Sequence, residues 1–175
     1  MIEIETPRLK MTQIRASDWA FFSALQRDPE VLRFVGDPLP ETTLRAAFET
    51  RLPRWSPGSR HWLCLVLRDK QTQQPLGLSG FVWREPGVSE VGFMLDPAAF
   101  GQGYGSESLR AVCRMAFSNP SMRKLTATVT VGNQASRNTL EKCNFQLEGC
   151  LRENYMIGGE WKDDWIFSLL RRELG

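Results

Sequence analysis

The stretch Phe100-Gly101-Gln102-Gly103-Tyr104-Gly105-Ser106 decides how the fold of this chain is interpreted. Glycine stands at every second position, which lets the backbone turn tightly and lets another group approach the main-chain amides closely. The preceding run, Val88–Leu95, lies between turn signals and reads as a strand. The residues that follow, Ser106–Phe117, carry apolar side chains along one helix face. The stretch is therefore predicted to join a strand to a long helix.

A glycine loop at a helix N-terminus is suited to hold phosphate, because the first N–H groups of a helix lack partners and the helix dipole is positive there. Two common phosphate motifs do not fit. The third glycine comes one position too early for the G-x-G-x-x-G dinucleotide motif, and no lysine follows as it does in the Walker loop. A tight turn that binds no ligand remains an alternative at this point.

Outward from the loop, hydrophobic periodicity predicts seven strands: Leu9–Ile14, His61–Leu67, Leu76–Trp83, Val88–Leu95, Lys124–Val131, Phe145–Leu151 and Trp161–Leu170. Helices are predicted between Ser17 and Asp28, over Glu41–Trp55, over Ser106–Phe117 and over Gln134–Cys143, with a short helical piece that ends at Val35. The order βααβββαβαββ has no repeats or linkers. It indicates a single α+β domain over residues 1–175, with helices around a sheet.

Composition argues against several classes of protein. Apolar residues make up 42% of the chain and charged residues 24%, and the net charge is only +2. This balance predicts no nucleic-acid or membrane partner. The apolar runs are too short to span a bilayer and no signal peptide is recognised, so a cytoplasmic location is expected. The single histidine and four scattered cysteines predict buried, reduced thiols and no metal site.

Four segments together resemble the GNAT acetyltransferase superfamily, and in particular its branch of RimJ/RimL-like, ribosomal-protein N-terminal acetyltransferases. They are Thr6-Pro7-Arg8-Leu9, Glu90–Pro97, Asn133–Phe145 and Ser168–Glu173. The glycine loop fits the family signature Gln/Arg-x-x-Gly-x-Gly/Ala at both glycine positions, but Phe100 replaces its first residue. The resemblance implies a mixed, mostly antiparallel sheet of seven strands flanked by helices, the acyl-CoA N-acyltransferase fold.

The resemblance also implies where acetyl-CoA, the cosubstrate, would bind. The backbone of Phe93, Met94 and Leu95 would pair with the pantetheine arm like an added strand. The cofactor would enter between strands 88–95 and 124–131, which splay apart in this fold. Asn133 would hydrogen-bond the same arm, and Asn138 is also expected to bind the cofactor. The pyrophosphate would be held by the loop residues Phe100, Gly101, Gln102, Gly103, Tyr104, Gly105 and Ser106.

Acetyl transfer to an amine needs a base for the amine and an acid or other stabilising group for the departing thiolate. Glu90, on the strand that leads into the loop, is the candidate base. The family often has a tyrosine acid where this chain has Leu140, so Ser136 is the candidate acid, with Tyr155 or water as alternatives. Trp83 and the loop 34–40 are expected to face the acceptor.

The expected activity is therefore acetyl transfer to a primary amine, either a protein or peptide N-terminal α-amine or a small-molecule amine. The alternative function is a non-catalytic module that binds acyl-CoA for regulation. The chain is expected to be a monomer or a homodimer.

Overall fold

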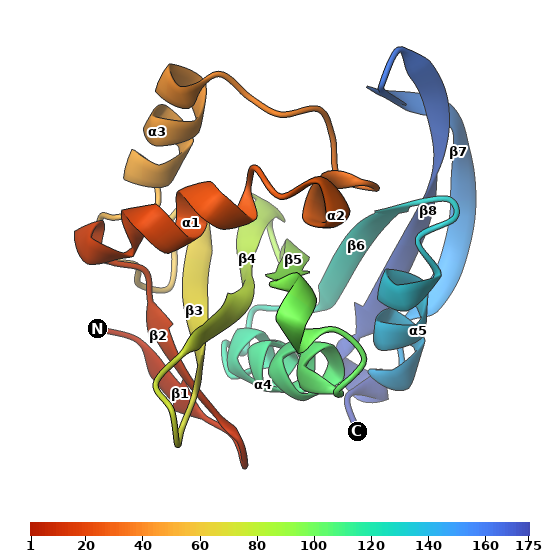
Figure 1. Ribbon diagram of the computed structural model, residues 1–175. Coiled ribbons are helices and arrows are strands. Elements are labelled where there is room, and N and C mark those ends of the chain that lie inside the picture. Colours follow the sequence, from red (N-terminus) through yellow and green to blue (C-terminus); the bar gives the residue numbers. More distant parts are fainter.

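A single twisted sheet of eight strands runs through the computed structural model, which describes residues 1–175 (Figure 1). The spatial order is β1-β2-β3-β4-β5-β6-β8-β7. All neighbours are antiparallel except β5 and β6, so the mixed, mostly antiparallel α+β sheet is confirmed. The strands are β1 (Glu3–Glu5), β2 (Leu9–Gln13), β3 (Leu63–Asp69), β4 (Pro75–Glu85), β5 (Val88–Leu95), β6 (Lys124–Thr130), β7 (Gln146–Ile157) and β8 (Glu160–Leu170).

The predicted count of seven strands was wrong by one. The additional strand, β1, has only three residues and lies at the edge of the sheet, where it pairs with β2. Three residues are too few to show a clear alternation of apolar and polar side chains. Strand β7 also continues six residues beyond the predicted end at Leu151, through a region that is almost wholly exposed and so carries no apolar pattern.

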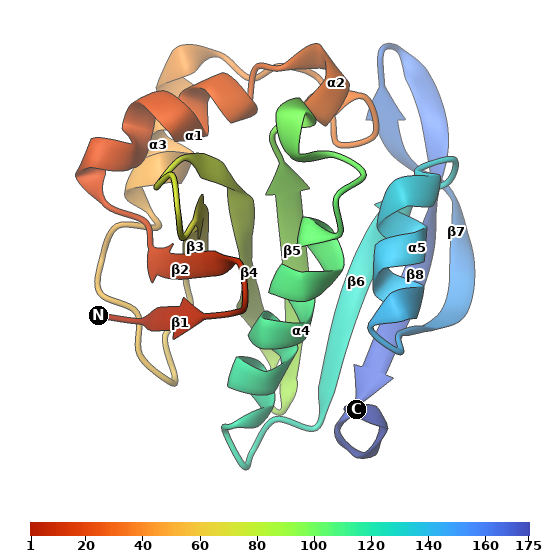
Figure 2. The same ribbon diagram turned by 60° about the horizontal axis from the view of Figure 1, so that its bottom comes forward.

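Helices cover both faces of the sheet (Figure 2). One face carries α4 (Tyr104–Phe117) beside α5 (Gln134–Lys142), and the other carries α1 (Trp19–Leu25), α2 (Pro29–Leu32) and α3 (Glu41–Glu49). Three short 3₁₀ helices complete the chain: Ala16–Asp18, Pro97–Ala99 and Arg171–Glu173. The larger hydrophobic core lies under α4, and a second, smaller core lies under α1 and α3.

The predicted helix Glu41–Trp55 was too long, because α3 ends at Glu49. The buried side chain of Gln13 explains the difference. Its amide donates to the carbonyl of Pro53 at 2.8 Å, and its oxygen accepts the N–H of Trp55 at 3.2 Å. These bonds hold residues 53–55 against β2 as an irregular segment, and Pro53 has no N–H with which to continue a helix.

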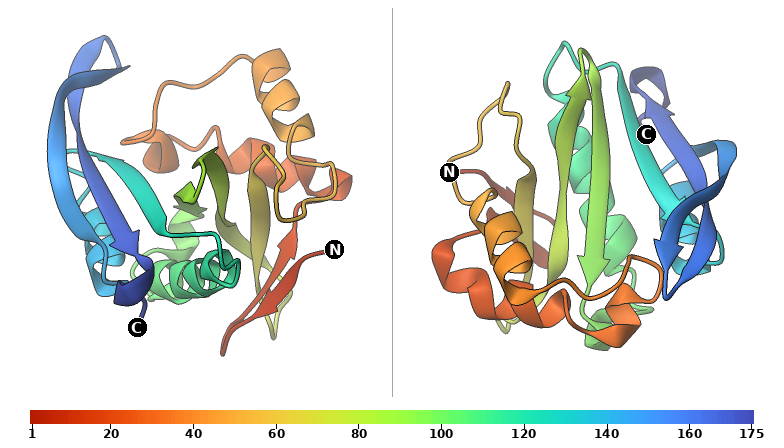
Figure 3. Two further views of the ribbon diagram at one scale, coloured as in Figure 1. Left: turned by 180° about the vertical axis from the view of Figure 1, so that it is seen from behind. Right: turned by 90° about the horizontal axis from the view of Figure 1, so that it is seen from above.

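Strands β5 and β6 pair over only three residues and then separate, as the resemblance implied. Val88, Ser89 and Glu90 face Lys124, Leu125 and Thr126 in parallel register, with no pairing beyond them. Both strands continue on their other sides, β5 with β4 up to Leu95 and β6 with β8 up to Thr130. Figure 3 shows, in its right panel, the two strands close at one end and apart at the other. The sheet is therefore open at its centre.

Candidate active site

The glycine loop forms the turn between the 3₁₀ helix Pro97–Ala99 and α4. Gly101 and Gly103 adopt φ angles of 71° and 82°, a left-handed conformation that favours glycine. Gly105 is needed for a different reason: a Cβ there would lie 3.2 Å from the hydroxyl of Thr139, so glycine lets α4 approach α5 closely. The alternating glycines thus fix both the turn and the packing of the two helices.

The amides of this loop have no partners within the protein. None of the six consecutive N–H groups from Gly101 to Ser106 donates a hydrogen bond to a backbone or side-chain acceptor. The last three belong to the first turn of α4, where N–H groups lack intrahelical acceptors and the dipole is positive. Six free donors at a helix N-terminus fit a diphosphate, so the residues present suit the pyrophosphate of coenzyme A. The side chain of Phe100 is exposed.

Arg8 and Glu107 fix the loop to the N-terminal strands, a role that sequence reasoning missed. The Glu107 carboxylate accepts hydrogen bonds from the Thr6 hydroxyl at 2.6 Å, the Arg8 amide at 3.0 Å and Nε of Arg8 at 2.7 Å. The guanidinium of Arg8 also donates to the carbonyl of Gln102 at 2.9 Å and stacks over the ring of Tyr104. The sequence had pointed to Arg8 only as part of the segment Thr6–Leu9 that resembles the family.

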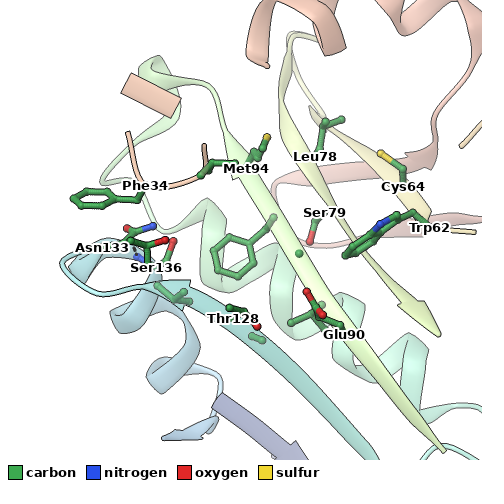
Figure 4. A pocket seen from close by; sticks show the side chains of 18 of the residues that line it. Phe34, Trp62, Cys64, Leu78, Ser79, Glu90, Met94, Thr128, Asn133 and Ser136 are labelled. Carbon is green, nitrogen blue, oxygen red and sulfur yellow. Dashed lines mark hydrogen bonds between the residues drawn. The ribbon is translucent and has the colours of Figure 1, made fainter. Parts of the chain in front are cut away.

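A cavity of about 360 Å³ opens where β5 and β6 separate (Figure 4). It collects Glu90, Phe93, Met94, Asn133 and Ser136, five of the residues singled out from the sequence. The other predicted cofactor residues do not line it: these are Leu95, Asn138 and the loop residues Phe100, Gly101, Gln102, Gly103, Tyr104, Gly105 and Ser106. The site therefore has two parts, a cavity between the strands and an amide-rich loop at the start of α4.

Glu90 lies at one end of the cavity, at the last residue pair before the strands separate. Its carboxylate accepts a hydrogen bond from Nε of Arg84, on β4, at 3.1 Å. The indole of Trp62 packs over the neighbouring Gly92, where a Cβ would approach it to 3.1 Å. Glu90 is thus held beside an aromatic wall and faces the open part of the sheet.

Asn133 and Ser136 lie at the other end of the cavity, where Figure 4 shows them side by side. The side-chain oxygen of Asn133 accepts the N–H of Ser136 at 3.2 Å and thereby caps α5. The Asn133 amide N–H₂ group and the Ser136 hydroxyl form no hydrogen bond within the protein, so both can act on a ligand. Asn138 is exposed on α5 and accepts from Gln134 at 2.8 Å.

Two segments add to the wall of the cavity. Phe34 and Val35, the first residues of the loop 34–40 after α2, line it, and Tyr155 lines it from β7. The amide of Gly158, at the tip of the β7–β8 hairpin, donates to Asp37 at 2.8 Å and links these two segments. The expectation for Trp83 was wrong. Its ring lies under the guanidinium of Arg60 and lines a separate pocket.

Cys64, Arg51 and Asp164 also line the cavity, although sequence reasoning gave them no role there. Burial raises the pKa of the Cys64 thiol to about 12, which the nearby charge of Arg51 offsets only in part. No local motif marks these residues, because β3, β8 and the segment after α3 bring them to the cavity from distant parts of the chain.

The fold and the two-part site define a class of protein that binds an acyl-CoA and presents it to a second substrate in a cavity. Comparison with known proteins identifies the family. Residues 8–146 match the family model described as an acetyltransferase (GNAT) domain. The chain belongs to the GNAT acetyltransferase family, and it is an acetyl-CoA-dependent N-acetyltransferase.

Relatives of known sequence and structure agree with this assignment. The chain is 26% identical to the uncharacterized N-acetyltransferase p20 of Bacillus licheniformis, over 99% of this chain and 98% of the relative. RimL, a ribosomal alpha-N-protein acetyltransferase solved with coenzyme A, superposes with a TM-score of 0.84 at 19% identity, over 97% and 98% of the two chains. The spermidine N-acetyltransferase of Vibrio cholerae, solved with CoA and spermine, gives 0.83 at 18% identity, over 96% and 98%. At these identities the structures demonstrate a common fold.

The molecule contains no group of three or more His, Cys, Asp or Glu side chains placed to hold a metal ion. None of its helices combines the length and the apolar character needed to cross a membrane.

Proposed function

We propose that the chain acetylates an N-terminal α-amine of a peptide or protein, with a small primary amine as the second candidate acceptor, and that Glu90 and Ser136 are its catalytic residues. One observation carries this proposal: the cavity at the open centre of the sheet has a carboxylate at one end and an unpaired hydroxyl at the other. The two structural neighbours named above differ in their acceptors, so the fold alone does not choose between these candidates.

The cosubstrate would lie across the open edge of β5. Beyond Glu90 that edge has no strand partner, so backbone groups of Phe93, Met94 and Leu95 are available to pair with the pantetheine amides. The free amide of Asn133 would donate to the same arm, and the loop amides Gly101–Ser106 would hold the pyrophosphate. When bound, acetyl-CoA supplies an acetyl thioester. A backbone N–H of β5 would stabilise the charge that develops on its oxygen.

Glu90 would accept the proton of the amine, either directly or through water. An α-amino group has a pKa of roughly 8, against roughly 10.4 for a lysine side chain, so it needs little help near neutral pH. The ion pair with Arg84 at 3.1 Å fixes the carboxylate on the face that the acceptor would approach. The lower pKa of the α-amino group therefore favours an α-amine over a lysine amine as the acceptor.

Ser136 would donate a proton to the departing sulfur. Its hydroxyl is free because the capping hydrogen bond to Asn133 is made by the backbone N–H of Ser136 and not by its side chain. Tyr155 lines the same cavity and, with water, remains the alternative acid. Comparing the variants Ser136→Ala and Tyr155→Phe identifies the donor, because only loss of the true acid should lower kcat about tenfold or more.

The base assignment is tested with Glu90→Gln and the matched control Glu85→Gln, an exposed residue of β4. Thiol release is followed over a panel of peptides and small amines between pH 6 and 9. Glu90→Gln should lower kcat about 100-fold across this range, whereas Glu85→Gln should leave it unchanged. An unchanged kcat for Glu90→Gln would exclude it as the base.

The same panel tests the non-catalytic alternative. If the protein binds acetyl-CoA but releases no thiol with any amine, the chain is a binding module and the proposed acceptors are wrong.

A further inference from the structure

Asp164 is a buried carboxylate at the wall of the cavity. It lies on β8, is 5% exposed, and faces Thr130 of β6 across the sheet. The Thr130 hydroxyl donates to it at 3.2 Å, and the side-chain amide of Asn154 donates at 2.8 Å. No Lys, Arg or His nitrogen lies within ion-pair distance of it. It therefore has neutral hydrogen-bond donors but no positive charge.

An unpaired buried charge is unusual, since carboxylates are almost never fully buried in proteins without a partner. The chain itself supplies the comparison. Asp18 is the other buried acidic residue, at 6% exposure, and it forms an ion pair with Arg68. The cationic partner that Asp18 has within the fold is missing at Asp164. Asp164 also lines the cavity that would receive the acceptor, whereas Asp18 does not.

The one cation that lines the cavity does not supply this partner. Arg51 contacts the opposite side, where it neighbours Cys64 and donates to the carbonyl of Ala47 at 2.7 Å. Asp164 instead lies at the end that holds Asn133, because Thr130, its strand partner, precedes the turn into α5. The negative charge at this end is therefore not neutralised by the protein.

An irregularity in β7 builds the surroundings of Asp164. The register between β7 and β8 shifts between Leu151 and Tyr155, and Glu153 there adopts a φ of 47°. The shift directs Asn154 to the Asp164 carboxylate and places Tyr155 on the cavity wall. Bulges beside active sites commonly reorient side chains in this way. The carboxylate is thus held in a fixed position by two strands.

We propose that Asp164 binds a positively charged group of the acceptor other than the amine that is acetylated. The preferred acceptor is then dicationic, either a small diamine or a peptide with a lysine or arginine side chain next to its N-terminus. This inference rests on the proposed function of the cavity and adds the selection of charge. Asp164 is a specificity residue here, while Glu90 and Ser136 carry the chemistry.

The test compares acceptors that differ only in the second charge: 1,4-diaminobutane against 1-aminobutane, and the peptide Ala-Lys-Ala against Ala-Gln-Ala. For at least one pair, the unmodified enzyme should show kcat/KM about tenfold or more higher for the charged member, mainly through KM. The pair that shows the effect identifies the source of the charge. Equal values within both pairs would overturn the proposal.

Asp164→Asn should reduce this preference to about one while leaving the uncharged acceptor nearly unaffected. Asp163→Asn is the matched control, because it removes the same charge one residue away, where the side chain accepts the amide of Glu153 outside the cavity. It should keep the preference. Equal losses for charged and uncharged acceptors in Asp164→Asn would mean a purely structural role and would also overturn the proposal.

A binding measurement separates this proposal from the activity. Calorimetric titration of the CoA-loaded protein, and of its Asp164→Asn variant, with 1,4-diaminobutane and 1-aminobutane needs no turnover. Selective binding of the diamine, lost in Asp164→Asn, would support the charge site even if no amine were acetylated, and in that case the proposed function alone would fail. Equal binding of both amines, with no peptide preference in the kinetic assay, would remove the charge site while leaving the acetyltransferase activity intact.

Discussion

The conformation of the glycine loop depends on single residues, and Gly103 is the position where we expect substitution to be tolerated least. Its φ of 82° is one that other residues adopt only with strain, and a Cβ there would lie 3.4 Å from the guanidinium of Arg8. Replacing Gly103 with valine should therefore displace the amides that follow it and weaken acetyl-CoA binding about 100-fold in a calorimetric titration.

Gln102→Ala is the control for this prediction. The Gln102 side chain donates to the carbonyl of Ala98 at 2.8 Å, and alanine keeps the backbone N–H of this position, so the substitution should change the Kd less than about threefold. If Gln102→Ala had the larger effect, the cofactor would be held by side chains and not by the backbone.

The four cysteines should differ sharply in reactivity, because burial raises the pKa of three of them. Cys64, with a pKa of about 12, remains a thiol at pH 8 although it lines the cavity. Cys150 is exposed. Iodoacetamide at pH 8 should therefore alkylate Cys150 first, at a rate about 100-fold above that of Cys64.

Peptide mass spectrometry measures these rates, and the protein unfolded in urea, where all four should react alike, is the control. Alkylation of Cys64 as fast as Cys150 would show that its thiol is neither protected nor neutral.

At the level of elements, the Arg8–Glu107 contact connects the turn between β1 and β2 to α4 and holds the glycine loop in place. Partial burial favours the neutral form of Glu107, but hydrogen bonds from Thr6 and Arg8 outweigh it and lower the pKa of this carboxyl. The folded-state pKa is below the unfolded one, so this stabilisation is present above the unfolded value of 4.5 and is lost as the pH falls through the folded one. The loop anchor should loosen only under acid conditions.

Arg8→Ala should raise KM for acetyl-CoA about tenfold and leave kcat unchanged, because it removes the charge-assisted bonds that position the loop. Lys10→Ala, two residues further along and on β2, is the control. Lys10 forms only an exposed ion pair with Glu3, at 3.4 Å, and such pairs contribute little. Steady-state kinetics measure both variants, and an equal KM for the two would mean that Arg8 does not position the loop.

Most elements could be predicted from local pattern, and the failures have physical causes. The predicted strand Val88–Leu95 was correct at both ends. The predicted helix Ser106–Phe117 was correct at its end, but α4 begins two residues earlier, at Tyr104, because its first turn is part of the glycine loop. Asn144, which follows α5, takes the left-handed conformation that commonly ends a helix, with a φ of 70°. The end of α3 was wrong because the side chain of Gln13, remote in sequence, fixes the segment that follows it.

The candidate site was predictable only where residues carry a motif. Glu90, Asn133 and Ser136 were found through the family pattern, and the structure places all three on one cavity. Asp164 and Arg51 carry no such pattern. Their positions depend on a bulge in β7 and on packing between segments far apart in the chain, which a single sequence does not encode locally.

At the scale of the whole molecule, the sheet consists of two parts, β1–β5 and β6–β8–β7, joined directly through three residue pairs. A cofactor bound between them would add hydrogen bonds along the separated stretches of β5 and β6. Acetyl-CoA should therefore slow hydrogen exchange of amides after Glu90 on β5 and after Thr126 on β6, by about tenfold or more.

Amides of the continuous β3–β4 ladder are the internal control, and their exchange should change much less. Exchange measured by NMR or mass spectrometry reports both regions. Uniform slowing across the sheet would indicate general stabilisation, and unchanged exchange in β5 and β6 would place the cofactor elsewhere.

The separation of β5 from β6 also affects the tendency of the protein to aggregate in solution. Each strand presents a row of unpaired backbone groups in the middle of a sheet, and such rows are templates on which other chains can add strands and aggregate. On the binding mode proposed above, the acetyl donor would cover them. Its concentration should consequently govern solubility as well as turnover: protein expressed or stored without coenzyme A should be lost to aggregates faster than the same protein kept saturated with it.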